Sequence, residues 1–219
     1  MVDTSAYQES PSPNLYFDRN FNLDASKILP GEYYVTRRDM VLVTVLGSCV
    51  AACIRDKTNG IGGMNHFMLP KSTHEKGGWL SASGRYGAYA MEVMINQILK
   101  QGAKRENLEA KLFGGGAVIK NMSAMNVGDD NAKFALEYLR KERIPVIAED
   151  LLGAHPRKVY FFPSTGKVLV KKLRSLPNDT VIAREQEYNT RLIASSIEGE
   201  IELFKWVLWA NLKTIKLKC

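Results

Sequence analysis

Cysteine is scarce in this chain of 219 residues, which contains only Cys49, Cys53 and Cys219. Three cysteines at uneven spacing are too few for the disulfide framework of a small secreted domain. A zinc site made of Cys49, Cys53 and His66 is also disfavoured, because strand positions four residues apart lie too far from each other to share one ion. No Cys-x-x-Cys pair is present either. We therefore expect free thiols, and neither a metal ion nor an organic cofactor.

Long hydrophobic runs are missing as well. No window approaches the roughly 18 uninterrupted apolar residues that a membrane-spanning helix needs. The first residues, MVDTSAYQESPSPN, contain no basic stretch followed by an apolar one, so we expect no secretory signal. A reducing, cytoplasmic setting is the expectation that follows.

The charge of the chain excludes little. Its net charge of +7 is moderate and is compatible with an acidic protein partner, with nucleic acid or with a membrane surface. Aromatic residues do not alternate with basic residues along one strand, so the usual pattern of an RNA-binding surface is missing and we expect no nucleic-acid partner. The triplet Gly114-Gly115-Gly116 resembles a phosphate-binding loop, but no Lys-Ser/Thr pair follows it. We expect a tight turn there that lets the backbone approach a functional site.

The rest of the composition is that of a globular α/β protein, with 45% apolar and 24% charged residues. From Asn14 to Leu29 we expect irregular structure, followed by a turn at Pro30-Gly31. Residue patterns after that turn predict strands at 32–36, 40–46, 50–55, 61–69, 109–113, 146–149, 158–162 and 167–173, and helices at 85–101 and from Asp129 or Asp130 to 143. After about Ser175 the pattern weakens.

Strands that alternate with two helices favour one layered α/β domain, which we place at residues 30–175. Residues 1–29 are then an N-terminal extension, partly disordered. Residues 176–219 are a basic, aromatic-rich C-terminal extension.

Residues 41–70 contain the strongest candidate site. Cys49 lies in a Gly-Ser-Cys turn after one apolar run, and His66 lies in the next apolar run. A thiol and an imidazole brought together are the minimum equipment for nucleophilic attack on a carbonyl group. The turn residues between the two runs predict a β-hairpin.

The register of this hairpin decides whether the two side chains meet. A two-residue turn at Asn59-Gly60 would place His66 opposite Cys53, with Cys49 about 13 Å further along the strand. A four-residue loop, residues 57–60, would place His66 opposite Ala51, and Cys49 would then be its diagonal neighbour within about 7–8 Å. We favour the longer loop.

These residues also have plainer interpretations. A buried cysteine is a common small core residue, which is how we interpret Cys53. A lone histidine among apolar neighbours is more often a core residue with its hydrogen bonds satisfied. Thr44 is placed to orient His66 by a hydrogen bond, although a threonine within a strand needs no function. In a rival arrangement Ser48 caps a short helix whose dipole would lower the pKa of the Cys49 thiol.

Six motifs occur in one order along the chain, beginning with LGSCVAACIRD and GIGGMNHFMLP. The others are RYGAYAMEVMINQIL, KLFGGGA, IPVIAEDLLG and RKVYFFPSTGKVLVKKL. With these motifs the sequence resembles the CheD family, the chemoreceptor glutamine deamidases of bacterial chemotaxis, over roughly residues 30–175. The resemblance implies a layered α/β sandwich of mixed and antiparallel sheets with helices packed outside, similar to deamidating bacterial toxins.

The resemblance also implies a Cys-His-Thr set that acts on glutamine side chains of chemoreceptors. Its cysteine matches Cys49 and its histidine matches His66. In some members the threonine lies six positions before the cysteine, where this chain has Val43, so the nearest match is Thr44. A second departure precedes the asparagine at position 131, where Asp129 and Asp130 replace the usual basic or polar pair.

The expected activity is conversion of receptor glutamine to glutamate through a thioester on Cys49. A cysteine peptidase or another amidase would use the same pair, and would be recognised by main-chain cleavage. The chain is alternatively a binding module for receptors or for a CheC-type phosphatase, a partner that the resemblance allows. Its tail, residues 203–219, has a composition compatible with peripheral contact to a membrane surface, but we favour an ordinary terminus, disordered or partly packed.

Overall fold

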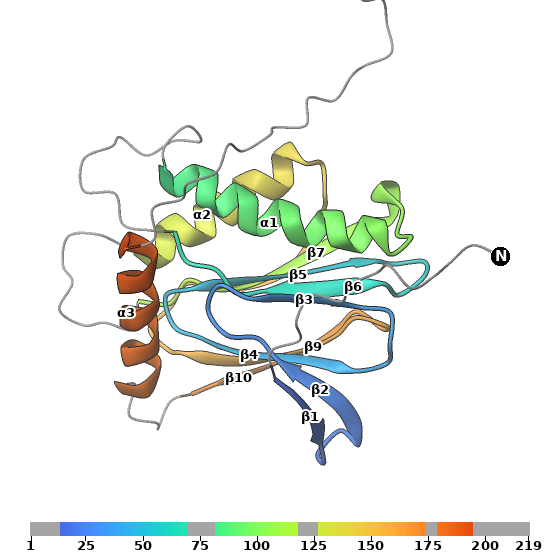
Figure 1. Cartoon of the computed structure of the whole chain (residues 1–219), viewed down its shortest axis with the longest axis horizontal. Coiled ribbons are helices and arrows are strands. Elements are labelled where there is room, and N and C mark those ends of the chain that lie inside the picture. The colour runs from blue at the N-terminus through green and yellow to red at the C-terminus, as the bar shows by residue number, and fades with distance from the viewer. Residues whose placement is uncertain (1–13, 70–81, 118–126, 174–178, 195–219) are drawn as a thin grey trace, which may run out of the picture.

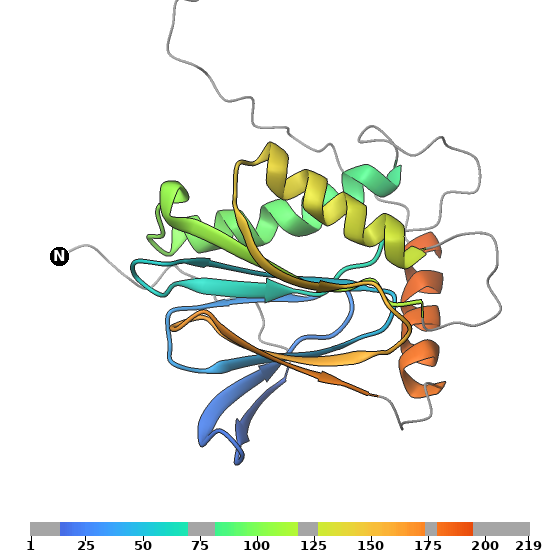
Figure 2. The ribbon, with the colours of Figure 1, turned by 180° about the vertical axis from the view of Figure 1, so that it is seen from behind.

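Two five-stranded sheets lie face to face, and two helices cover the outer face of one of them (Figure 1). This computed structural model describes residues 14–69, 82–117, 127–173 and 179–194. The covering helices are α1 (Ala82–Lys100) and α2 (Val127–Lys141). The view from behind shows the same three layers, with helices over sheet over sheet (Figure 2). The predicted layered α/β sandwich is confirmed.

The sheet beneath the helices has the strand order β3-β6-β5-β7-β8. All neighbours in it are antiparallel except β7 and β8, which run parallel. A short 3₁₀ turn, η1 (Arg105–Asn107), leads from α1 into β7. The strands are β3 (Tyr33–Thr36), β5 (Val50–Asp56), β6 (Gly62–Asn65), β7 (Leu108–Gly114) and β8 (Val146–Leu151).

The second sheet has the order β1-β2-β4-β9-β10, with β2 and β4 parallel and the other pairs antiparallel. Its strands are β1 (Leu15–Asp18), β2 (Leu23–Lys27), β4 (Val41–Leu46), β9 (Arg157–Phe162) and β10 (Lys167–Lys172). Each sheet thus contains one parallel pair, so both are mixed, as predicted.

Side-chain alternation along the strands separates two apolar layers. From β5, Ala51 and Cys53 face the other sheet, while Val50 and Ile54 face α1 and α2. Met91, Met94, Ile95 and Ile98 form the buried stripe of α1. Cys53 is therefore a core residue between the sheets, as predicted.

The prediction of irregular structure from Asn14 to Leu29 was wrong, because β1 and β2 lie there. The three apolar side chains that open β1 are all exposed, so this edge strand lacks the alternation of buried and exposed residues that marks a strand in a sequence. The turn at Pro30-Gly31 is confirmed, with a hydrogen bond from the Glu32 N–H to the Leu29 carbonyl.

A third helix, α3 (Asp179–Ala194), lies where the sequence pattern weakens, and no helix was expected there. Among its described side chains only Glu185 and Tyr188 are buried, and the charged Glu185 interrupts the apolar stripe that would mark a helix in a sequence. The helix stands across one end of the sandwich, with one end beside the start of α2 (Figure 1).

The favoured hairpin register is confirmed. Cys53 pairs with Met64, and Val50 bridges to Phe67, so His66 lies opposite Ala51 with residues 57–60 as the loop. The rival helix beginning at Ser48 was wrong, because β5 starts at Val50. Asp129 and Asp130 lie inside the first turn of α2 and do not precede it. Within the described residues no helix is long and apolar enough to cross a membrane.

Candidate active site

The segment that carries Cys49 passes from one sheet to the other. Strand β4 ends at Leu46 in one sheet and β5 begins at Val50 in the other, so residues 47–49 form the crossover. The glycine triplet holds this crossover in place: the Gly115 N–H donates to the Cys49 carbonyl at 2.8 Å, and the Gly116 N–H donates to the Gly47 carbonyl at 2.7 Å. A Cβ atom on Gly114 would lie 2.1 Å from the Cys49 carbonyl oxygen. The predicted close approach of this turn is confirmed.

His66 follows the end of β6 and faces the interior between the sheets. Its backbone is fixed by the Pro30-Gly31 turn, because the Gly31 N–H donates to the His66 carbonyl at 2.7 Å and the His66 N–H donates to the Glu32 carbonyl at 2.9 Å. Its ring is buried. Together, the β5–β6 hairpin and the turn before β3 therefore fix the position of the imidazole.

Thr44, on β4, determines which ring nitrogen of His66 carries the proton. Its hydroxyl lies 2.7 Å from the Ile28 carbonyl and 2.8 Å from His66 Nδ1. A hydroxyl has one proton, and only the carbonyl must receive it, so Thr44 Oγ1 accepts from Nδ1–H. The neutral ring then presents an unprotonated Nε2, which is buried and has no hydrogen-bond partner among the described residues.

The thiol of Cys49 lies beside this imidazole. Cys49 Sγ, a ring nitrogen of His66 and a carboxylate oxygen of Glu185 all lie within 4.8 Å of one another. Because Nδ1 is engaged with Thr44, Nε2 is the nitrogen available to the thiol. The structure thus brings together all three residues that the sequence singled out.

Burial keeps both members of the pair uncharged. Desolvation lowers the pKa of His66 from 6.5 to about 4, although the Glu185 carboxylate and the Ile28 carbonyl act in the opposite direction. Desolvation, followed by the negative charge of Glu185, raises the pKa of the Cys49 thiol well above its ordinary value. The resting pair is therefore a thiol and a neutral imidazole.

Glu185 reaches the site from α3 and was not anticipated from the sequence. One carboxylate oxygen accepts from the N–H groups of Gly47 at 2.9 Å and Cys49 at 3.1 Å. The other accepts from the Ser48 N–H at 3.0 Å and the Ser48 hydroxyl at 2.7 Å. Successive backbone N–H groups that converge in this way form an anion-binding concavity.

Asn131, on α2, is a second residue that sequence reasoning missed. Its side chain is fully buried, donates to the Ser48 carbonyl at 2.9 Å and accepts from the Leu69 N–H at 2.8 Å. It therefore joins the segment that carries Cys49 to the segment that follows His66. The signals in the sequence were a polar residue on the buried face of a predicted helix and the asparagine that the family resemblance marks at this position.

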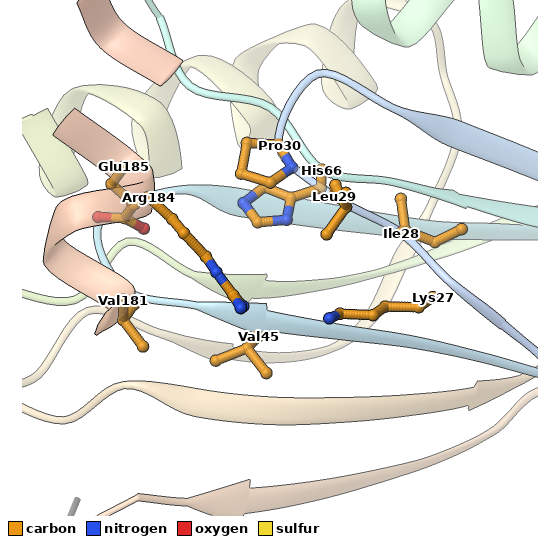
Figure 3. Close-up of a pocket in the computed structure, with 9 residues that line it drawn as sticks. All are labelled: Lys27, Ile28, Leu29, Pro30, Val45, His66, Val181, Arg184 and Glu185. Atoms are coloured by element: carbon orange, nitrogen blue, oxygen red, sulfur yellow. The ribbon is translucent and has the colours of Figure 1, made fainter. Parts of the chain in front are cut away.

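A pocket connects His66 with the surface along α3 (Figure 3). Lys27 and Arg184 extend toward each other from opposite sides of this pocket (Figure 3). Pro30 and His66 both line it. Val181, Arg184 and Glu185 form the wall contributed by α3.

Cysteine, histidine and glutamate are all metal-binding residue types, but this cluster suits an ion poorly. Each Glu185 oxygen already accepts two hydrogen bonds, and Nδ1 of His66 is bonded to Thr44. Few lone pairs therefore remain directed at a common centre. The geometry is that of a carboxylate held by N–H and O–H donors.

Comparison with known proteins places this site in a family. A protein of Thiobacillus denitrificans described as "Probable chemoreceptor glutamine deamidase CheD" is 62% identical over 200 residues, which cover 91% of this chain and 99% of that protein. A protein of Herminiimonas arsenicoxydans with the same description is 61% identical over 197 residues, covering 90% of this chain and 97% of its own length. The chain belongs to the CheD family. The family model described as "CheD chemotactic sensory transduction" matches residues 68–172.

Among solved structures, the Bacillus licheniformis hypothetical protein YfiH matches 56% of this chain and 51% of its own, with 15% identity and a TM-score of 0.36. A likeness this low supports no conclusion. The sequence relatives and not a structural neighbour establish that this is a CheD protein. Residues 70–81, which precede α1, and the aromatic-rich tail, residues 203–219, lie outside the described residues.

Proposed function

We propose that this CheD protein is a protein-glutamine deamidase that converts glutamine side chains of methyl-accepting chemoreceptors to glutamate. The observation that carries the proposal is the meeting of the Cys49 thiol with the free Nε2 of His66 beside converging backbone N–H groups. High identity to proteins described as chemoreceptor glutamine deamidases supports the substrate.

The first half of the reaction releases ammonia. As Cys49 Sγ attacks the side-chain carbonyl carbon, its proton passes to His66 Nε2, so the thiolate forms only as it is used. The new oxyanion is stabilised by the N–H groups of Ser48 and Cys49. The C–N bond then breaks, His66 returns its proton to the leaving nitrogen, and a thioester remains on Cys49.

The second half hydrolyses the thioester. Nε2, again unprotonated, takes a proton from a water molecule as the water oxygen attacks the thioester carbon. The C–S bond breaks, the thiolate recovers the proton from His66, and glutamate is left. Thr44 holds the ring in the tautomer that both steps need, so we assign it the role of a positioning residue.

Three further assignments accompany this proposal. We place the protein in the cytoplasm, where the chemoreceptor domains that it modifies are located. We include a CheC-type phosphatase as a second partner, to be tested by co-purification with the Cys49→Ala variant.

Peripheral membrane contact by the tail is tested by co-sedimentation with anionic vesicles, with and without residues 201–219; equal partitioning would exclude it.

The decisive experiment incubates the protein with a purified receptor cytoplasmic fragment and maps glutamines that gain about one dalton, the mass change when NH₂ is replaced by OH. Cys49→Ala should abolish the gains. Cys53→Ala is the matched control, because Cys53 is buried in the same interlayer core but does not belong to the cluster around His66, and it should retain activity. Gains that persist without Cys49 would contradict the mechanism, and main-chain cleavage would indicate a peptidase.

A further inference from the structure

The carboxylate of Glu185 occupies the position that the mechanism requires for the substrate. Its four hydrogen-bond donors include the N–H groups of Ser48 and Cys49, which are the groups assigned to the oxyanion. Its oxygen lies within 4.8 Å of Cys49 Sγ. The glutamate side chain, itself the product of glutamine deamidation, is thus bound in the catalytic site of its own chain.

We propose that α3 is an internal product mimic that closes the active site and must leave it before a receptor glutamine can bind. This inference rests on the proposed deamidase function and adds a means of regulating it. Glu185 reaches the nucleophile from the middle of a 16-residue helix.

The contacts that hold α3 in place are compatible with its displacement by the substrate. Tyr188, one turn after Glu185, is the other buried side chain among those described in α3, and its hydroxyl is bonded to that of Tyr86. Val181 and Asn189 are half-buried. Ala183, Arg184, Gln186, Glu187, Thr190 and Arg191 are exposed. Among the described side chains of α3, the contacts with the rest of the protein are thus mainly the hydrogen bonds of Glu185 and Tyr188.

The charge of Glu185 also makes the nucleophile less reactive while α3 occupies the site. Its carboxylate raises the pKa of the Cys49 thiol in addition to the effect of burial. A glutamine carboxamide in the same place carries no charge and would leave the thiol easier to ionise. Replacement of the Glu185 carboxylate by a substrate glutamine thus removes an obstacle to attack.

The variant Glu185→Gln tests the proposal directly, because it converts the mimic into a substrate. Cys49 would attack the side-chain carbonyl carbon of the introduced glutamine, the C–N bond would break with loss of ammonia, and water would restore glutamate at position 185 with recovery of the thiol. We expect this residue to gain about one dalton at a rate independent of protein concentration, as for a reaction within one molecule. Digestion after lysine keeps position 185 inside the peptide 173–205.

Two controls belong to this experiment. Gln186 is exposed and lies in the same peptide, so it should remain glutamine while the introduced glutamine is converted. The double variant Cys49→Ala, Glu185→Gln should keep glutamine at both positions. A folded Glu185→Gln variant in which the introduced glutamine persists, while a receptor fragment is still deamidated, would overturn the inference and leave the deamidase function intact. Failure of both reactions would instead overturn the deamidase function.

A second measurement does not depend on that variant. The Cys49→Ala protein is mixed with excess receptor fragment, and amide hydrogen exchange is followed along the full chain. Displacement predicts faster exchange in α3 and unchanged or slower exchange in β4 and β5. Slower exchange in α3 on receptor binding would show that the helix stays in place, and would contradict the proposal.

A third experiment measures how far α3 inhibits deamidation of the receptor fragment. Glu185→Ala should deamidate the receptor fragment several-fold faster than the wild type at limiting substrate, because the competing carboxylate is gone. Glu187→Ala is the matched control, since Glu187 is an exposed carboxylate on the same helix. A Glu185→Ala variant that folds and is no faster than Glu187→Ala would exclude closure by α3.

Discussion

At the scale of single residues, the Thr44 hydroxyl is the clearest case of one atom setting the chemistry of another. It donates to a backbone carbonyl and can therefore only accept from His66 Nδ1, which leaves Nε2 free for the thiol. The orienting partner of a histidine is usually a carboxylate or a carbonyl. Here a neutral hydroxyl does this, so no second negative charge is added beside the thiol.

The residue-scale prediction follows from that bond. Thr44→Val keeps the shape of the side chain but removes the acceptor, and we expect kcat for deamidation to fall about tenfold to a hundredfold, the usual cost of losing a partner that orients a histidine. Thr44→Ser keeps the hydroxyl and should restore most of the activity. Both variants should unfold within a similar range of urea. Equal kcat values for Thr44→Val and the wild type would remove Thr44 from the site.

The sequence supplied three of the residues in the site but not the two that come from helices. Cys49 and His66 lie beside strands of one hairpin, whose register follows from counting loop residues, so their meeting was predictable. Thr44 lies in the other sheet and was suggested as the nearest match to the threonine that the family resemblance implies. Asn131 and Glu185 arrive from helices α2 and α3, and nothing in the spacing of a sequence indicates the angle at which a helix crosses a sheet.

At the scale of elements, the turn from Gly114 to Gly116 holds the backbone of the nucleophile Cys49 in place. Gly114 has φ of 114°, and a Cβ there would meet the Cys49 carbonyl oxygen at 2.1 Å. Gly102 has a comparable φ of 101°, but no atom lies within 4 Å of its Cβ position. Comparing the two glycines therefore separates the cost of a positive φ, which both have, from the cost of a close atomic contact, which only Gly114 has.

The element-scale prediction compares alanine at these two positions. Gly102→Ala should lower the free energy of unfolding by about 1 kcal/mol, the cost of a side chain in the left-handed region, with unchanged deamidation. Gly114→Ala should cost distinctly more and should impair deamidation, because the carbonyl of Cys49 must move. Urea unfolding and receptor assays on both variants provide the measurement. Equal losses would mean that the close approach to Cys49 is unimportant.

Two of the elements that sequence analysis missed, β1 and α3, share one physical property. Strand β1 exposes most of its side chains at a sheet edge, and α3 buries few of its described side chains. Periodicity arises from burial on one face, so an element with little burial leaves a weak pattern. By contrast, α1 and the strands β4, β5 and β7 contribute to the core and were placed within a few residues of their observed bounds.

At the scale of the whole molecule, the buried histidine makes folding depend on pH. The folded protein holds His66 with a pKa of about 4, whereas in the unfolded chain its pKa is 6.5. Above the unfolded value neither state is protonated, so this residue costs no stability. As the pH falls below 6.5 the unfolded chain binds a proton that the folded protein does not, and stability declines until the folded pKa is reached.

We therefore predict a loss of roughly 2 kcal/mol in the free energy of unfolding between about pH 7.5 and pH 5 through His66 alone. Urea unfolding at the two pH values measures it. His66→Gln, which cannot titrate, should lose that share of the pH dependence, while the other histidines contribute equally to both proteins. Identical pH dependence of the two proteins would show that His66 is not held neutral.

The division into a domain of residues 30–175 with an extension at either end remains a prediction. Strands β1 and β2 belong to the same sheet as β4, and α3 contributes Glu185 to the site. Removing either extension and measuring the unfolding of what is left would show how far the predicted domain is independent.

The crossover between the sheets has a consequence for the order in which a ribosome delivers the chain. Cys49 and His66 emerge early, but β4 needs β9 as its neighbour, and Thr44 pairs with Val159, far downstream. A nascent chain that already contains the nucleophile and its base therefore still lacks half of the frame that aligns them. We therefore expect the active site to form only after β9 has been translated, so that a polypeptide ending before β9 would be inactive.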